Sequence, residues 1–314
     1  MNLGLTVNCW SDEDMLFARQ FGVTHILAEA SIPQGLLWDR RTLASIRNRA
    51  EKADFAFTGL AGLPQSYDAS TYLQQAMCND PAGEEGLDAL CAFITEAGAA
   101  RIPLIVCECD VLGASESVIA PEGRADALIH KYVRPAHADP VIVAALWQHF
   151  TCWLHRVVPV AEKAGVKLAL GAKHISAGWL DSVEAIQHLL DVVPSPCVGL
   201  VFRQGVITQT PGVDLLTAIR HFGAQKKIFL VEVSNLQSKP SYVVEAFLDE
   251  TMREATTDIA PILRALQAYH AAGYEGTVQP ATPLGMVGDT VWGHKGQAFN
   301  LGYLRALLQV VERA

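Results

Sequence analysis

Residues 197–233 read CVGLVFRQGVITQTPGVDLLTAIRHFGAQKKIFLVEV, and the fold class follows from this stretch. Cys197–Phe202 and Lys227–Val233 are short apolar runs rich in β-branched residues, a composition typical of buried strands. Between them, Asp214–Phe222 has apolar residues at three- and four-residue spacing, as an amphipathic helix does. Gly223 then supplies the left-handed residue expected just past a helix. The stretch therefore predicts a strand, a helix and a second strand parallel to the first.

The same strand–helix unit recurs along the whole chain. The other predicted strands are Leu3–Asn8, His25–Ala30, Phe55–Ala61, Ile102–Glu108, Val166–Leu170 and Tyr274–Gln279. The other predicted helices are Asp12–Phe21, Arg41–Ala53, Glu84–Ala97, Val141–Ala164, Ser182–Val192, Ile259–Ala272 and Leu301–Glu312. Units of this kind that close on themselves make a (β/α)8 TIM barrel, so we predict an α/β protein with a single barrel domain over residues 1–314.

Three long connections follow the third, fourth and eighth predicted strands, at residues 62–85, 109–140 and 280–300. In a TIM barrel the connections after strands lie over the active-site face, and long ones are usually lids or binding loops. A doubly wound open sheet is the alternative architecture. The Gly-x-Gly-x-x-Gly fingerprint of that architecture follows none of the predicted strands, which favours the barrel.

Composition and charge exclude several classes of partner. The 24 Lys and Arg residues against 33 Asp and Glu give a net charge of −9, which disfavours binding to nucleic acid. No apolar run approaches the roughly 18 residues of a membrane helix, and the N-terminus lacks the basic and apolar regions of a signal peptide. The seven cysteines are odd in number and form no Cys-x-x-Cys pair, which favours reduced thiols and a cytoplasmic location.

Polar side chains end several otherwise apolar strands, at the positions where TIM barrels carry their functional residues. We predict that Glu232 is a general acid/base and that Arg203 binds a substrate carboxylate or oxyanion. The full set of predicted catalytic residues is Glu232, Arg203, Glu108 and Lys173. The predicted substrate-binding residues are Glu29, Trp10, Asn8, His174, Gln279 and Trp38. No metal ligand is predicted.

Structural explanations compete with each of these roles. Arg203 and Glu232 follow adjacent strands and could simply form an ion pair that closes the barrel mouth. A register error of one residue would turn Glu29 or Glu108 toward the helices. His174 is a surface residue on the alternative interpretation. Trp10 and Trp38 either wall a sugar pocket or pack in the barrel rim. The sequence leaves these alternatives open.

Several segments outside the predicted catalytic positions resemble a known family. They are Glu29–Trp38 after the second strand, Val158–Val166 before the fifth, His221-Phe-Gly223 before the seventh and Ala298–Leu307 in the last helix. On these segments the chain resembles the mannonate dehydratase family, within the wider group of xylose-isomerase-like barrels, over nearly its whole length. The resemblance implies a lyase that acts on a sugar acid.

The resemblance also implies a divalent metal, typically manganese or iron(II), held by His, Cys, His and Asp after strands five to eight. The corresponding positions here are Gly171, Arg203, Glu232 and Ala281, so the family's ligands are replaced. We therefore predict no cofactor, with the Arg203 guanidinium in place of the cation. A manganese or iron(II) site remains an alternative only if Glu29, Glu108 and Glu232 rebuild it.

The leading hypothesis is a divergent lyase or dehydratase for a sugar acid or a related small polyol or carbonyl compound, without the family's metal. Three alternatives stay open: a sugar isomerase or epimerase, a catalytically silent ligand-binding paralogue, and a true mannonate dehydratase whose ligand positions are aligned differently. The expected partner is a small carbohydrate-like molecule. The resemblance leaves a homo-oligomer open, because barrels of this group often associate through their helices.

Overall fold

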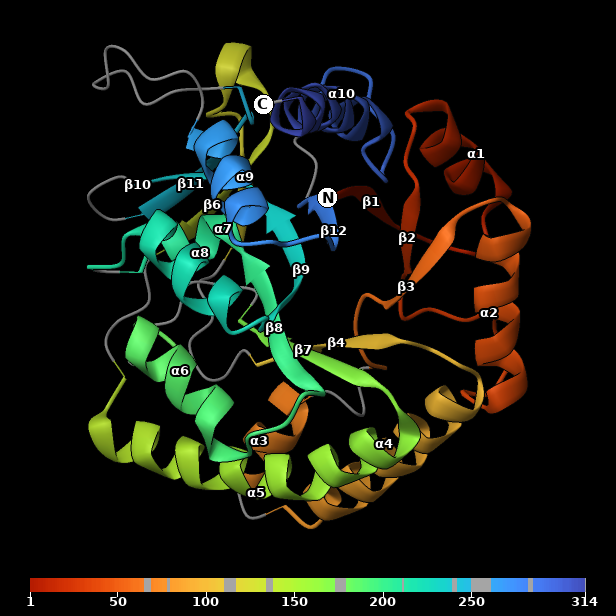
Figure 1. Cartoon of the computed structure of the whole chain (residues 1–314), viewed down its shortest axis with the longest axis vertical. Coiled ribbons are helices and arrows are strands. Elements are labelled where there is room, and N and C mark those ends of the chain that lie inside the picture. The colour runs from red at the N-terminus through yellow and green to blue at the C-terminus, as the bar shows by residue number, and fades with distance from the viewer. Residues whose placement is uncertain are drawn as a thin grey trace.

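A ring of parallel strands with helices around it forms the centre of the molecule (Figure 1). The computed structural model describes residues 1–64, 69–77, 80–109, 117–133, 138–172, 179–210, 212–238, 242–249, 261–281 and 285–313. The barrel strands in this part of the chain are β1 (Asn2–Val7), β2 (His25–Ala28), β3 (Ala56–Leu60), β4 (Leu104–Glu108), β7 (Lys167–Gly171), β8 (Val198–Arg203), β9 (Ile228–Val233) and β12 (Thr277–Pro280). They close in the order β1-β12-β9-β8-β7-β4-β3-β2, so the predicted TIM barrel is confirmed.

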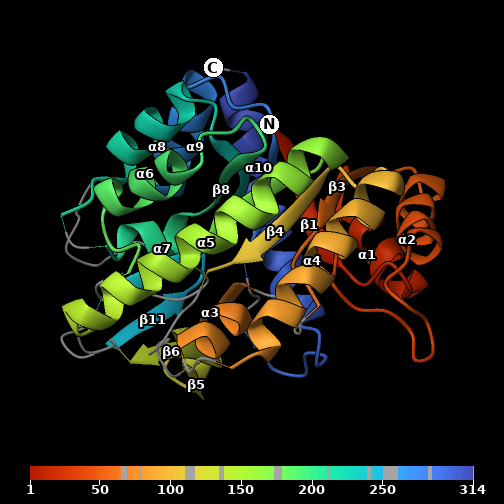
Figure 2. The same cartoon turned by 90° about the horizontal axis from the view of Figure 1, so that it is seen from below.

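Helices alternate with these strands and cover the outside of the barrel. They are α1 (Asp12–Gln20), α2 (Arg40–Lys52), α4 (Ala82–Ala99), α5 (Pro140–Ala164), α6 (Val183–Val192), α8 (Leu215–Ala224), α9 (Pro261–Ala271) and α10 (His294–Glu312). Two shorter helices lie in the connections, α3 (Ala69–Met77) after β3 and α7 (Gln204–Thr208) after β8. Figure 2 shows α3 beside α4 and α5. Within the described ranges, no helix combines the length and apolar character that a membrane span needs.

Local sequence signals account for where the helices begin and end. The Asp139 carboxylate accepts a hydrogen bond from the Val141 amide, and Pro140 occupies the first turn of α5. Gly165 ends that helix in the left-handed conformation at φ 69°. Gly223 differs from the prediction, because α8 continues through it to Ala224. A Cβ at Gly223 would lie 2.7 Å from the Ala272 Cβ, so this glycine permits close packing instead.

The last helix also begins earlier than predicted, at His294 instead of Leu301. The polar stretch before Leu301 gives little helical signal. The first turn of α10 is stabilised by a residue outside the helix, because the Asp289 carboxylate accepts hydrogen bonds from the Lys295 and Gly296 amides at 2.8 and 3.0 Å.

The apolar residues form two layers that follow the alternation of the strands. Alternate strand residues such as Ile105 and Phe202 join the large core between barrel and helices. Their neighbours Val106, Val201 and Leu230 belong to a separate cluster. In a strand, side chains two residues apart point the same way. Glu108, Arg203 and Glu232, two residues after this second set, therefore lie on the inner side of the barrel at its mouth.

A small antiparallel sheet lies beyond the carboxyl ends of the barrel strands. Its described strands are β5 (Ser117–Ala120) and β6 (Ile129–Val133) from the connection after β4, with the short 3-10 helix η2 (Arg124–Asp126) between them, and β10 (Asn235–Ser238) and β11 (Tyr242–Ala246) from the connection after β9. The sheet order is β10-β11-β6-β5. Ile129, Val244 and Phe247 pack beneath it against Phe299 of α10. The sequence analysis did not predict this sheet.

Candidate active site

The barrel register brings the polar strand ends to one level. Arg203 of β8 pairs in register with Glu232 of β9, and Glu232 pairs with Gln279 of β12. On the other side, Glu108 of β4 pairs with Gly171 of β7. All of these residues lie at the carboxyl ends of their strands, so distant parts of the sequence meet at the barrel mouth.

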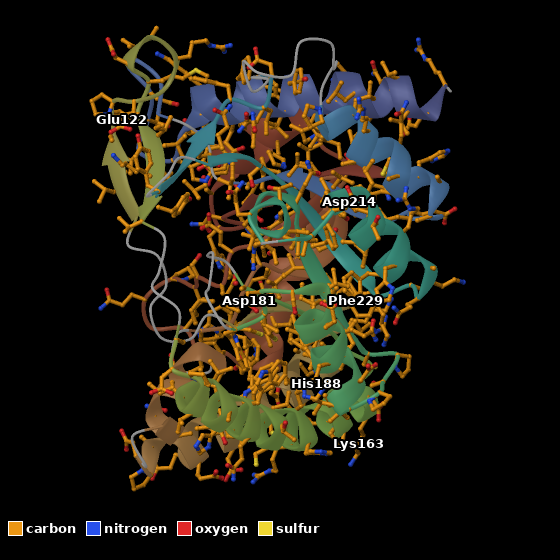
Figure 3. All side chains as sticks on the ribbon, turned by 90° about the vertical axis from the view of Figure 1, so that its left-hand side faces the viewer. Glu122, Lys163, Asp181, His188, Asp214 and Phe229 are labelled. Atoms are coloured by element: carbon orange, nitrogen blue, oxygen red, sulfur yellow. The ribbon has the colours of Figure 1, made fainter. Side chains whose placement is uncertain are left out.

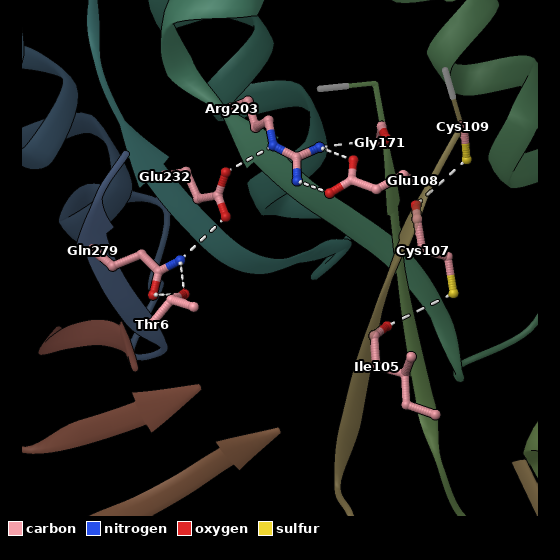
Figure 4. Close-up of polar contacts among 9 residues, drawn as sticks. All are labelled: Thr6, Ile105, Cys107, Glu108, Cys109, Gly171, Arg203, Glu232 and Gln279. Carbon is pink, nitrogen blue, oxygen red and sulfur yellow. Dashed lines mark hydrogen bonds and ion pairs between the residues drawn. The ribbon is translucent and has the colours of Figure 1, made fainter. Parts of the chain in front are cut away.

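At the barrel mouth, Arg203 lies between the carboxylates of Glu108 and Glu232 (Figure 4). Its Nη1 and Nη2 donate to the two oxygens of Glu108 at 2.8 and 2.7 Å, and its Nε donates to Glu232 Oε2 at 2.7 Å. Nη1 also lies 3.4 Å from the Gly171 carbonyl oxygen. The Arg203, Glu108 and Glu232 side chains are only 10%, 20% and 17% exposed. The bidentate contact therefore fixes Arg203 on Glu108, while Glu232 holds it by one hydrogen bond.

The hydrogen-bond network continues from Glu232 across the mouth. Gln279 Nε2 donates to Glu232 Oε1 at 3.1 Å and also contacts the Thr6 hydroxyl at 3.1 Å. Both oxygens of Glu232 thus accept hydrogen bonds from the protein. This orients the carboxylate within the mouth, where the strand register places it.

A cavity of about 460 Å³ lies at the barrel mouth, next to these hydrogen-bonded side chains. Its lining residues are Leu5, Thr6, Glu29, Ala61, Glu108, Tyr132, Arg203, Val206, Glu232, Ser234, Leu236, Glu245, Gln279, Pro280, Ala281, Val291, Trp292 and Gln297. The size is that of a small-molecule site. Barrel strands supply the floor, whereas Tyr132, Leu236 and Glu245 come from the antiparallel sheet.

Glu245 is a deeply buried carboxyl group in the lining of the cavity. It is 4% exposed, and burial raises its pKa to about 8. Its Oε2 has no hydrogen-bond partner among the described residues. Tyr132 lies on the neighbouring strand opposite Val243, two residues from Glu245, and burial together with the Glu245 charge raises the pKa of its hydroxyl. At neutral pH, Glu245 is therefore a protonated acid that faces a polar cavity.

This burial predicts a pH-dependent stability. Because folded protein binds the Glu245 proton more tightly than unfolded chain, the stabilisation is complete below the ordinary pKa of 4.5 and is lost as pH rises through about 8. Glu245→Gln removes this titration. Urea unfolding at pH 5 and pH 8 is expected to show a wild-type free energy of unfolding that falls by at least about 1.4 kcal/mol more than that of the variant.

Glu162→Gln is the matched control, since that carboxylate bonds to Ser195 outside the cavity. It should keep the wild-type pH dependence. Identical pH dependence in Glu245→Gln and wild type would show that Glu245 is ionised in the folded protein at pH 5 to 8.

Glu29 faces the cavity from the end of β2. Burial raises its pKa, the charge of Asp14 raises it further, and a hydrogen bond from the Trp292 indole acts in the opposite direction. Trp292 lies in the connection after β12 and also packs against Phe17 at 5.4 Å between ring centroids. Trp292 and Tyr132 are the aromatic residues of the described lining, and Trp10 and Trp38 are not part of it.

The structure brings Glu29, Glu108, Arg203, Glu232 and Gln279 of the predicted site residues into one cavity. Three others lie outside its lining. Asn8 Oδ1 accepts from the Trp10 amide, the Trp10 ring lies 5.7 Å from the Arg49 guanidinium, and Trp38 packs against Phe93 in α4. These three residues have local structural partners. Lys173 and His174 lie outside the described residues.

Known proteins resemble this chain in sequence and in fold. The family model of D-mannonate dehydratase matches residues 125–314, more than half of the chain. The chain belongs to the D-mannonate dehydratase family. A mannonate dehydratase from Thermotoga petrophila is 28% identical over 170 residues, which cover 52% of this chain and 44% of that protein. The chain thus spans just under half the length of this curated relative.

Solved structures share the whole barrel. The mannonate dehydratase from Streptococcus suis serotype 2 superposes with a TM-score of 0.79 at 16% identity, covering 100% of this chain and 94% of that one. A xylose isomerase domain protein from Planctomyces limnophilus gives 0.64 at 14% identity, covering 100% and 98%. An L-ribulose 3-epimerase gives 0.63 at 14% identity, covering 99% and 96%. The xylose-isomerase-like fold is therefore confirmed.

The residues present do not fit the metal centre that membership of the D-mannonate dehydratase family implies. Gly171 and Ala281 have no ligating side chain, and Arg203 places a positive charge between Glu108 and Glu232. Among the described residues, no group of three or more His, Cys, Asp or Glu side chains is arranged to hold a metal ion. The alternative site made of Glu29, Glu108 and Glu232 is therefore not supported. A metal ion beside the guanidinium would be repelled by it.

Glu245, Tyr132 and Trp292 line the cavity and are not among the residues predicted from the sequence. Tyr242–Ala246 carries two adjacent β-branched residues before Glu245, a short strand-like signal inside a connection. A search for such runs after the seventh strand would have found it. Nothing in the sequence around Trp292 indicates that its connection folds back over the mouth.

Proposed function

We propose that the chain is a sugar-modifying lyase of the D-mannonate dehydratase family that works by general acid–base catalysis, with Arg203 where the family has its metal. Such a reaction removes a proton next to a carbonyl group and expels the neighbouring hydroxyl as water. It needs a base, an acid and a positive charge for the oxyanion that forms. The cavity offers one group for each task.

Glu232 is the base in this proposal. It takes the proton from carbon, and the electron pair of the broken C–H bond moves toward the carbonyl oxygen. Protonation of Glu232 weakens its hold on Arg203 Nε, which contacts it at 2.7 Å. The guanidinium charge then becomes available to the developing oxyanion. Glu108 is a positioning residue, because its bidentate contact keeps Arg203 in place during this change.

Glu245 is the acid. The electron pair held on the oxyanion returns to form a carbon–carbon double bond, the neighbouring carbon–oxygen bond breaks, and Glu245 gives its proton to the leaving hydroxyl, which departs as water. The observation that carries the proposal is the contrast between two carboxyl groups of one cavity: Glu232 is ion-paired with Arg203, whereas burial raises the pKa of Glu245 to about 8. One ion-paired carboxylate and one buried carboxyl group in the same cavity are a typical arrangement for a base and an acid.

A second candidate is an epimerase or isomerase. Glu232 comes from β9 in the barrel and Glu245 from β11 in the antiparallel sheet, so the two carboxyl groups belong to different walls of the cavity. A base and an acid on different walls suit removal of a proton from one face of a carbon and its return on the other. No hydroxyl would leave in that reaction.

Proton exchange separates these candidates. We expect incubation of the protein with hexonates, aldohexoses and ketohexoses in D₂O to give, for one of them, deuterium at one carbon together with loss of water, seen by NMR and mass spectrometry. Deuterium without loss of water would assign an epimerase or isomerase. If no sugar exchanges a proton while one still binds, the chain is a silent binding paralogue and the proposal fails.

A further inference from the structure

The charges that line the cavity are unevenly matched. The charged residues among the described lining are Glu29, Glu108, Glu232 and Glu245, with Arg203 as the one cation. Arg203 already pairs with Glu108 and Glu232. Even with Glu245 protonated, the described lining keeps an excess of negative charge.

Two polar atoms of the described lining lack a hydrogen-bond partner among the described residues. They are Glu245 Oε2 and Gln297 Oε1, and both are buried. A sugar hydroxyl can donate to the Gln297 amide oxygen and can also accept from a protonated Glu245, whereas an ionised carboxylate can only accept. A ligand rich in hydroxyl groups therefore complements both groups, and a carboxylate complements only the protonated Glu245.

Arg203 is a poor anchor for a substrate carboxylate. A carboxylate that bound Arg203 through two parallel hydrogen bonds would have to displace Glu108 or Glu232, each of which is at most one-fifth exposed. The displaced side chain would then be a largely buried charge without its ion pair, which is strongly unfavourable. This differs from the carboxylate-binding role predicted for Arg203 from the sequence.

We infer that the cavity takes an uncharged polyhydroxylated sugar, an aldose or a ketose, and disfavours a sugar acid. The inference rests on the proposed function, because it concerns the substrate of the same cavity. Glu29 is the residue that sets this preference, since Arg203 does not contact its carboxylate, and Gln297 is a hydroxyl-binding residue.

Binding by the full chain tests the inference without turnover. The probes are D-mannonate and D-mannitol, which differ in carrying a carboxylate or a CH₂OH group at one end, together with D-fructose as a carbonyl-bearing sugar. Isothermal titration calorimetry is expected to show at least about tenfold tighter binding of mannitol or fructose than of mannonate. Raising the salt concentration from about 0.05 to 0.5 M should strengthen mannonate binding, because salt screens repulsion between exposed or partly exposed charges, and leave mannitol unchanged.

Two variants locate the effect. Glu29→Gln is expected to reduce the ratio of the mannitol affinity to the mannonate affinity at least threefold. Glu122→Gln is the matched control: it changes the net charge equally, but Glu122 lies beyond the barrel near the edge of the antiparallel sheet, paired with Lys131 (Figure 3). It should leave both affinities unchanged.

Mannonate binding as tight as that of the neutral probes would overturn the inference. Loss of mannonate binding in Lys173→Met would also overturn it, because Lys173 would then be a carboxylate anchor. Failure of both neutral probes to bind would overturn it as well. These titrations measure binding and need no catalysis, so the Glu232→Gln variant can be used in them as well. If the wild-type protein binds mannitol tightly but exchanges a proton on none of the sugars tested in D₂O, the proposed function is refuted and the inferred substrate class stands.

Discussion

Replacing Glu232 by Gln is expected to lower kcat by about 10²- to 10⁴-fold on whichever sugar exchanges a proton, the range typical for loss of a general base. The amide keeps the shape of the side chain but cannot take the proton. Because Gln279 and Arg203 remain beside it, substrate binding should change little. Steady-state kinetics with the NMR-identified substrate measure kcat and KM separately.

Glu162→Gln, the remote carboxylate variant, controls for the loss of a negative charge and should keep wild-type kcat. A kcat for Glu232→Gln within threefold of the wild-type value would contradict the assignment of the base. A large rise in KM with unchanged kcat would instead make Glu232 a binding residue.

Replacing Arg203 by Met is expected to lower the free energy of unfolding by about 3–5 kcal/mol, because it leaves Glu108 and Glu232 as largely buried charges without their cation. The methionine keeps most of the side-chain length, so the lost charge dominates the effect. Denaturation in urea, followed by circular dichroism at pH 7, measures the change.

Arg156→Met is the matched control. Its side chain is 50% exposed and pairs with the exposed Asp88, so the expected loss is below about 1 kcal/mol. Adding Glu108→Gln and Glu232→Gln to Arg203→Met removes the unpaired charges and should restore much of the lost stability. An Arg203→Met protein as stable as Arg156→Met would mean that the barrel mouth hydrates these carboxylates fully.

The sequence was sufficient to predict the barrel because its strands carry their own signal. Apolar runs such as Lys227–Val233 read as buried parallel strands, and this run ends at Val233, where the structure ends β9. Glu108, Arg203 and Glu232 could be grouped before the structure was known, since parallel strands bring their carboxyl ends to one edge. The Arg203–Glu232 ion pair was one of the alternatives that the sequence offered, and it is present. The pairing of Arg203 with Glu108 could not be assigned, because a contact across the mouth depends on closure of the barrel.

The antiparallel sheet could not be predicted for a related reason. β6 and β11 lie more than 100 residues apart in the sequence and pair with each other, a contact that local sequence does not specify. The raised pKa of Glu245 follows from burial in the folded protein, so it could not be predicted either. Trp10 and Trp38 were predicted to wall the cavity, but they lie outside its lining. Trp10 lies beside Arg49 and Trp38 packs against Phe93, and local sequence does not specify these partners.

Arg203 in the centre of the ring has one consequence for the life of the protein in a cell. A metal ion is in exchange with its surroundings, so a metal enzyme exists in empty and loaded forms whose ratio follows nutrient supply. The guanidinium is part of the polypeptide and is present in every copy from the moment of synthesis. Under the proposed mechanism, starvation for manganese or iron would leave the active fraction of this protein unchanged, while its metal-dependent relatives lost theirs.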